Sequence, residues 1–160
     1  EGGMLAFLRR APVAPAIPFD FALALPRVTS ATVTPTPKRP QVSCTSAAPL
    51  TGSDGGYVSV RWSVQLDPDT FARFSWTFVV PPNATSVKAP ELPAALASMA
   101  PGDELDTEQV AFIESDTLPS FAALKSVPFR NYFRTGSPFE PSVPLAANGN
   151  VRISGWNTSD

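Results

Sequence analysis

Two neighbouring stretches decide the fold: Tyr57-Val-Ser-Val-Arg-Trp-Ser-Val-Gln-Leu66 and Arg73-Phe-Ser-Trp-Thr-Phe-Val-Val80. In both, apolar and polar side chains alternate residue by residue. Successive side chains of a strand point to opposite faces of a sheet. The pattern therefore predicts two strands with one face in a core and the other in water, joined by a hairpin loop over residues 67–72. We expect Trp62 and Trp76 to lie on the core face and to anchor it.

The rest of the chain repeats this pattern in shorter pieces. Further strands are expected at residues 19–25, 27–34, 41–46, 86–89, 104–115 and 150–156, with one short helical stretch at 94–100. The 19 prolines are spread along the chain, and proline inside a helix removes a hydrogen bond and clashes with the preceding turn. Short strands separated by turns predict an all-β fold: an antiparallel β-sandwich, immunoglobulin/fibronectin-like or jelly-roll-like.

The first 18 residues differ in composition from the rest of the chain. A short apolar tip, which we expect to form one or two helical turns, precedes an extended proline-rich linker. Residues 1–18 are therefore predicted to be an N-terminal arm, and residues 19–160 the sandwich domain. The tip either packs across its own domain or docks on a neighbouring subunit or domain. Its candidate contact residues are Met4, Leu5, Phe7 and Leu8.

The composition excludes several classes of function. The chain contains no histidine, which rules out Ser-His-Asp and Cys-His catalysis and any zinc site that uses histidine. With a net charge of −2 and scattered basic residues, nucleic acid is not an expected partner. No stretch reaches the ~18 apolar residues of a membrane-spanning helix. The single Cys44 is expected to be a half-buried strand residue, with an intermolecular bridge or a reactive thiol as alternatives.

Acidic residues in the predicted loops leave two further alternatives open. They are Asp67, Asp69, Asp103, Glu104, Asp106 and Glu108. A hydrolase of the glycosidase type needs two carboxyl groups roughly 5–9 Å apart, and nothing in the sequence brings a given pair together. Calcium binds six to eight oxygens, and the two acidic runs resemble half of such a ligand set. We predict no catalytic residue and no cofactor, with calcium as the alternative.

Aromatic residues outside the clearest alternation provide another lead. They are Tyr57, Phe71, Tyr132, Phe133, Phe139 and Trp156. If exposed in a row, such rings would stack on sugars, whereas the simpler interpretation is that they cover the core. The segment Arg130-Asn-Tyr-Phe-Arg134 mixes arginine with aromatics, the residue types enriched at binding hot spots. Its candidate contact residues are Arg130, Tyr132, Phe133 and Arg134.

The stretch Arg73-Phe-Ser-Trp-Thr-Phe-Val-Val-Pro-Pro-Asn-Ala-Thr-Ser-Val-Lys-Ala-Pro-Glu-Leu-Pro93 resembles fibronectin- or immunoglobulin-like sandwich modules of bacterial secreted and surface proteins. An aromatic strand ends at a proline pair, and a second strand then runs into a Pro-x-Leu-Pro segment. The resemblance implies an extracytoplasmic β-module and carries no catalytic residues.

These observations together predict a non-enzymatic structural or interaction module of an exported bacterial surface protein, and specifically a subunit of an assembly. Low lysine with abundant Ser, Thr, Pro and Ala is typical of exported chains. Other protein subunits or domains are the expected partners. A carbohydrate-binding module that uses exposed aromatics and a hydrolase that uses loop carboxylates are the alternative functions.

Overall fold

The computed structural model describes residues 2–10, 20–34, 39–102, 105–127 and 149–157. The strands are β1 (Gly2–Arg9), β2 (Val28–Thr34), β3 (Gln41–Ser46), β4 (Gly55–Asp67), β5 (Thr70–Val80), β6 (Ser86–Lys88), β7 (Asp106–Ser115) and β8 (Asn150–Asn157). Two 3₁₀ turns, η1 (Phe21–Leu23) and η2 (Ala94–Met99), and one helix, α1 (Phe121–Lys125), complete the described elements.

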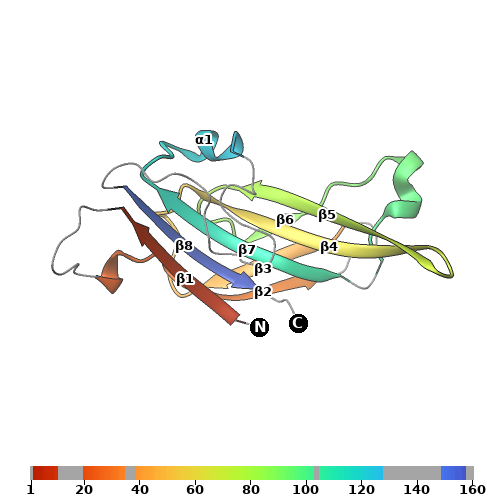
Figure 1. Ribbon diagram of the computed structural model, residues 1–160, viewed down its shortest axis with the longest axis horizontal. Helices are drawn as coiled ribbons and strands as arrows, with labels where there is room; N and C mark the ends of the chain where they lie inside the picture. The colour runs from red at the N-terminus through yellow and green to blue at the C-terminus, as the bar shows by residue number, and fades with distance from the viewer. Residues whose placement is uncertain (1, 11–19, 35–38, 103–104, 128–148, 158–160) are drawn as a thin grey trace.

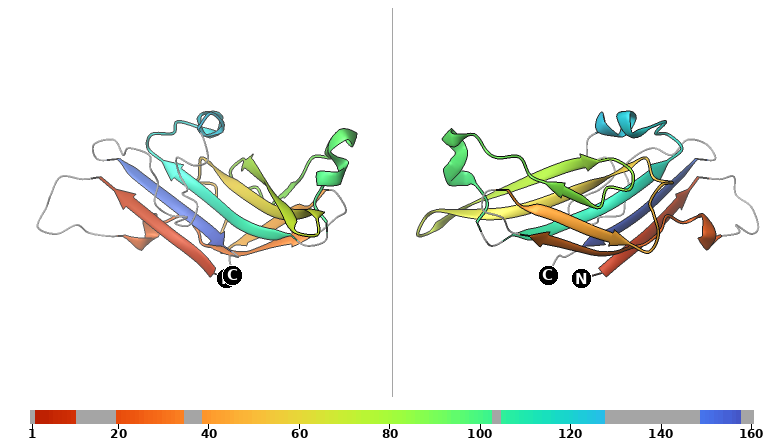
Figure 2. Two further views of the ribbon diagram at one scale, coloured as in Figure 1. Left: turned by 45° about the vertical axis from the view of Figure 1, so that its right-hand side comes forward. Right: turned by 180° about the vertical axis from the view of Figure 1, so that it is seen from behind.

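The strands form two antiparallel sheets, as Figures 1 and 2 show. A five-stranded sheet has the order β1-β8-β7-β4-β5, and a three-stranded sheet has the order β2-β3-β6. All paired neighbours run antiparallel. The prediction of an all-β fold is confirmed.

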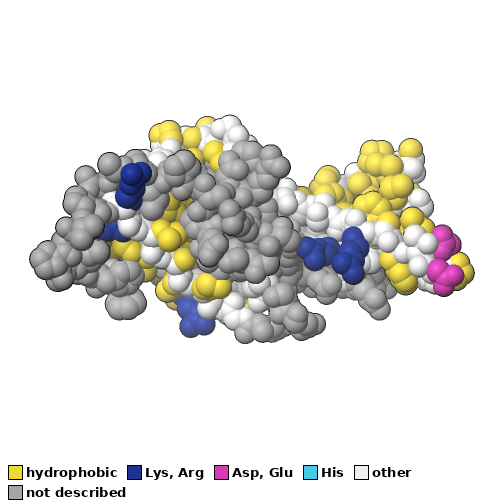
Figure 3. All heavy atoms as spheres, in the orientation of Figure 1, with side chains coloured by type: hydrophobic (Ala, Val, Ile, Leu, Met, Phe, Trp, Pro, Cys, Tyr) yellow, Lys and Arg dark blue, Asp and Glu magenta, His cyan; other side chains and the backbone are white. Residues whose placement is uncertain are grey.

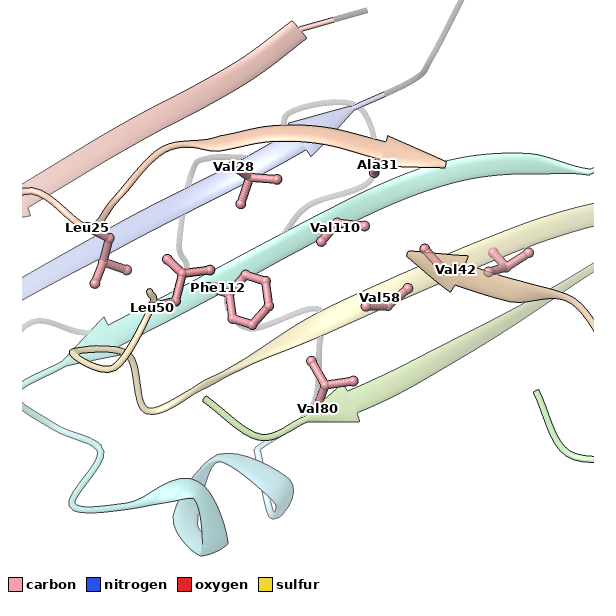
Figure 4. Close-up of a cluster of buried hydrophobic side chains, with 10 residues drawn as sticks. Leu25, Val28, Ala31, Val42, Leu50, Val58, Val80, Val110 and Phe112 are labelled. Carbon is pink, nitrogen blue, oxygen red and sulfur yellow. The ribbon is translucent and has the colours of Figure 1, made fainter. Parts of the chain in front are cut away.

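One core lies between the facing sides of the two sheets (Figure 4). The larger sheet contributes Val58, Val60, Val80, Val110 and Phe112, and the smaller sheet contributes Val28, Ala31 and Val42, with Leu25 and Leu50 from the loops. Most of these are β-branched, and such side chains pack well on a pleated surface. The alternation predicted for the two central strands is confirmed on this face at Val58, Val60, Phe78 and Val80, whereas Leu66, which the same alternation places on the core side, is 60% exposed.

The opposite face of the larger sheet is also buried at one end, which the sequence pattern did not predict. Tyr57, placed on the wet face by its position in the alternation, is only 1% exposed. It belongs to a second cluster with Ile113 and Ile153, which is covered by Leu124 of α1. The Tyr57 hydroxyl donates to the Leu124 carbonyl at 3.4 Å and to that of Val127 at 3.2 Å. The prediction that Tyr57 faces water fails because the residues that cover it belong to α1, and the sequence of β4 alone gives no sign of them.

Residues 2–9 of the predicted N-terminal arm do not form the expected helical turns, and they pack against their own domain, which was one of the two alternatives. These residues form β1, which pairs with β8 along its whole length, from Gly2 opposite Asn157 to Arg9 opposite Asn150. In this edge strand the apolar side chains lie on both faces of the sheet, and the run forms no helical turn. Residues 11–18 of the predicted linker lie outside the described residues.

Two further expectations are corrected by local hydrogen bonds. Residues 19–25 were predicted to be a strand, but Asp20 closes a 3₁₀ turn by accepting from the Ala22 amide through its carboxylate and from the Leu23 amide through its carbonyl. Asp and Asn commonly replace regular structure by such local bonds.

The hairpin loop is also shorter than predicted, because Asp67 pairs with Thr70 and leaves a two-residue turn.

Gly55 provides a test of this packing. Its φ of 144° is a backbone conformation that side chains disfavour. An added Cβ would lie 2.7 Å from the Val80 carbonyl and 2.8 Å from side-chain carbons of Leu124 and Phe121. We expect Gly55→Ala to lower the free energy of unfolding by about 2–4 kcal/mol, measured by chemical denaturation.

Gly52 is the matched control, three residues away. A Cβ there would meet only a Leu25 methyl group, at 3.9 Å. Gly52→Ala is expected to leave the stability within about 0.5 kcal/mol of the wild type. Equal losses in the two variants would contradict the packing described around Gly55.

Candidate functional site

The most prominent surface feature is a hairpin that extends beyond the body of the larger sheet. Strand β7 pairs with β4 only between Gly55 and Arg61. From Trp62 to Asp67, β4 therefore has β5 as its only partner among the described residues. Figure 1 shows this two-stranded extension of the sheet.

A row of aromatic rings leads from the body of the sheet to the base of the extension. Trp62 stacks on Phe74, which lies directly opposite on β5, with 5.6 Å between ring centroids. Trp76 lies 4.6 Å from Trp62 and 6.1 Å from Phe78. The Trp62 indole N–H donates to the Met99 carbonyl at 2.9 Å. Because an isolated two-stranded hairpin is marginally stable in water, this row has a structural role.

The two tryptophans are not equally buried. Trp62 is 4% exposed, as predicted for a core anchor, whereas Trp76 is only half-buried. Neither belongs to the core shared by the two sheets. The prediction that both anchor that core is therefore wrong. They belong to an aromatic row that leads from Phe78, which packs against that core, to Trp62 and Phe74 at the base of the extension.

The end of the hairpin carries exposed apolar side chains. Leu66 is 60% exposed and Phe71 is 62% exposed, and we call these two residues the hairpin tip. Leu96 and Met99 of η2 are also exposed. Figure 3 shows hydrophobic side chains gathered over η2 and acidic side chains at the end of the hairpin. Large exposed apolar groups that gather in one region are typical of interaction surfaces.

The backbones of Asp67 and Asp106 lie too far apart for these two residues to form the pair that a glycosidase requires. Asp106 lies opposite Arg61 on β4, six residues before Asp67, so about 20 Å of strand separates the two backbones. The Asp67 carboxylate accepts from the Asp69 amide at 3.1 Å and so stabilises the turn. Asp103 and Glu104 lie outside the described residues, as do the side chains of Asp106 and Glu108. Within the described part of the chain, no three potential metal-ligating side chains cluster.

The predicted exposed aromatics are scattered. Phe71 is exposed, Trp156 is half-buried and Tyr57 is buried. Tyr132, Phe133, Phe139 and the whole Arg130–Arg134 patch lie outside the described residues. Among the aromatics that the structure describes, these three do not form a planar row for a sugar.

The four contact residues predicted near the N-terminus do not share one surface. They lie along β1, whose successive side chains alternate between the two faces of the sheet. Met4 and Leu5 are exposed, whereas Phe7 and Leu8 are half-buried. Leu8 packs against the cluster around Ile153. Half of the predicted contact set is thus partly covered by the fold itself.

A polar cavity of ≈ 320 Å³ lies at the end of β1, β7 and β8. In it, Arg152 donates to the Glu114 carboxylate at 2.5 Å and to the Leu23 carbonyl at 2.7 Å. The bond to Glu114 raises the pKa of Arg152. Asp116 accepts from the backbone and side-chain amides of Asn150 at 2.8 and 2.9 Å. These groups satisfy one another and join β7 to β8 and η1. Sequence reasoning missed them because their partners are far apart in the chain.

Asp54 borders this charged region. Its carboxylate accepts from the Ser115 amide at 2.8 Å. Burial raises the pKa of Asp54 above its ordinary value of 3.8, and the nearby Glu114 and Asp116 act in the same direction. The folded state therefore favours the protonated acid more than the unfolded chain does.

This shift predicts a pH dependence for Asp54→Asn. The stability that Asp54 contributes is complete below the unfolded pKa and is lost as pH rises through the raised folded pKa. Asparagine keeps an oxygen for Ser115 and does not titrate. Relative to the wild type, the variant is expected to gain stability as pH rises from about 4 to 7. Denaturation curves across this range check the result, and a difference independent of pH would contradict it.

Cys44 lies beside a mostly apolar groove of ≈ 580 Å³ formed with residues 45–50 and 83–85. Its thiol donates to the Ala84 carbonyl at 3.6 Å. Burial raises the pKa of Cys44 above its ordinary value of 9.0. The half-buried strand position predicted for Cys44 is confirmed, and the raised pKa disfavours the alternative of a reactive thiol.

The raised pKa predicts slow chemistry at Cys44. The thiolate is the nucleophile, and its population at neutral pH is reduced in the folded protein. Iodoacetamide is expected to alkylate the native protein at least about tenfold more slowly than the chain unfolded in guanidinium. Mass spectrometry over time measures both rates, and equal rates would overturn the expectation.

The described elements define the chain as an all-β protein of two antiparallel sheets with an extended hairpin. No family model, no curated protein and no solved structure is similar to this chain. In the described residues, none of the helices has the length and apolar character needed to cross a membrane.

Proposed function

We propose that this chain is a non-enzymatic structural or interaction module of an exported bacterial surface protein, and that it works as a subunit of an assembly. Its fold is proposed to be a β-sandwich of the immunoglobulin, fibronectin or jelly-roll type. Two antiparallel sheets with a common core support that type. The composition, low in lysine and rich in Ser, Thr, Pro and Ala, supports an extracytoplasmic location.

One observation carries the proposed function: the exposed hairpin tip. The chain holds Leu66 and Phe71 away from both cores, on an extension with an aromatic row at its base. Burying a large apolar side chain contributes about 1.5–3 kcal/mol, and neither residue obtains this within its own fold. Apolar groups on a rigid support bind with little loss of conformational entropy. Another protein subunit is the partner that such a tip fits.

The contact surface proposed here is the hairpin tip, whereas the sequence predicted a contact surface on the N-terminal arm. Docking of the N-terminal tip on a neighbouring subunit, one of the two alternatives predicted from the sequence, would remove β1 from the sheet and break its pairing with β8. Deleting residues 1–18 would therefore disturb the fold as well as any assembly. The hairpin tip projects from the sheet and can be altered without touching either core.

Site-specific photo-cross-linking in the producing cells tests the function. Leu66→p-benzoylphenylalanine is expected to give a discrete adduct with another protein in the extracytoplasmic fraction, since position 66 is exposed at the contact surface. Mass spectrometry identifies the captured chain, whether a second copy or a different subunit.

The same probe at Leu23 is the matched control. Leu23 is 54% exposed and lies in η1, away from the hairpin. The control is expected to give no such adduct. The proposal fails if position 66 gives no adduct, or gives only those that position 23 also gives.

A further inference from the structure

The two edges of the larger sheet differ in how they are protected. At one edge, the Gly3 carbonyl of β1 accepts from the Arg27 side chain at 3.4 Å, and the start of β2 lies against Gly3. At the other edge, β5 pairs with β4 alone in the part of the chain that the structure describes. Figure 2 shows β5 at this margin of the sheet.

Strand β5 has few of the features that prevent edge-to-edge pairing. Natural edges are short, bulged, or guarded by proline and lysine. This one runs for 11 residues, from Thr70 to Val80, and contains no proline and no lysine. Its only charged residue is Arg73. The irregularity in the hairpin register lies on β4, between Gln65 and Asp67, so β5 itself continues without a bulge.

We propose that β5 pairs with β5 of a second copy of this chain, antiparallel and around a two-fold axis. The two five-stranded sheets then form one continuous sheet. This inference deepens the proposed function, on which it rests, by naming a second copy as one partner. It concerns the backbone edge of β5, which includes Phe71, whereas the cross-link proposed above probes Leu66 on β4.

The sequence of β5 is complementary to itself in one register. Pairing all 11 residues places Ser75 on the axis, with Thr70 of one copy opposite Val80 of the other. In this register Phe74 lies opposite Trp76 of the second copy, on the half-buried aromatic face. Aromatic cross-strand pairs of this kind stabilise sheets. The aromatic rows of both copies become neighbours.

The charges also fit this register. Arg73 lies opposite Thr77 of the second copy, so the single charge of β5 never faces itself. On the same face, Ser75 and Thr77 are exposed and polar. The backbone would gain about ten hydrogen bonds along a fully paired strand.

Two variants of one residue test the pairing and its register. Thr77→Lys places a positive charge opposite Arg73 of the second copy, twice in the dimer, and Thr77→Glu places a negative charge there. Sedimentation velocity of the full chain, from micromolar to millimolar concentration, gives the dimer dissociation constant. We expect about tenfold weaker dimerisation for Thr77→Lys, and unchanged or tighter dimerisation for Thr77→Glu.

Ionic strength and a second site provide the controls. Because exposed charges are screened by salt, high salt is expected to reduce the difference between the dimer dissociation constants of the two variants. Thr32→Lys adds the same charge to an exposed position of β2, at the edge of the other sheet, and is expected to dimerise like the wild type. Circular dichroism verifies that each variant is folded.

The inference is overturned if the wild type stays monomeric through millimolar concentration, or if Thr77→Lys and Thr77→Glu have the same dissociation constant at low salt. Either result leaves the proposed function standing as long as Leu66 still cross-links to another protein. A missing cross-link at Leu66 together with an intact, charge-sensitive dimer would reject the hairpin tip and keep the β5 pairing.

Discussion

Strand β4 connects every layer of this molecule. It hydrogen-bonds to β7 over its first half and to β5 over nearly its whole length. Val58 and Val60 reach the core between the sheets, while Tyr57 reaches the cluster under α1. Trp62 lies in the aromatic row at the base of the extension. The first half of β4 is covered on both faces, whereas its second half pairs only with β5 among the described strands. The molecule is therefore thick where the two sheets overlap and thin where the hairpin projects.

The parts of the fold that were predictable are those encoded locally. Strict alternation located β4 and β5, and the β3 prediction matches its observed bounds of Gln41–Ser46. Tyr57 could not be placed, because its burial depends on a segment more than sixty residues later. Residues 2–9 could not be assigned either, because an edge strand that shows apolar groups on both faces lacks the period that distinguishes a strand from a helical turn. Their partner, β8, lies at the other end of the chain.

The sequence predicted which types of residue the candidate site would contain, but it did not predict where in the fold the site lies. Exposed apolar residues and arginine–aromatic mixtures indicated contact with other proteins, and the hairpin tip is of this kind. Its location follows from where β7 stops pairing with β4, and that length mismatch between strands is a property of the sheet. Strand β5 is a long edge with a single charge because it is the last strand in the order of the larger sheet.

The pairing of β1 with β8 also limits when the larger sheet can be completed. Among the described strands, β1 has only β8 as a ladder partner, and the two lie more than 140 residues apart in the sequence. Contacts between residues so distant in sequence close large loops, which slows folding. Met4–Leu8 therefore stay unpaired and apolar until β8 has been synthesised. The larger sheet is complete only once β8 is available, and until then β1 is a segment that a chaperone would have to shield.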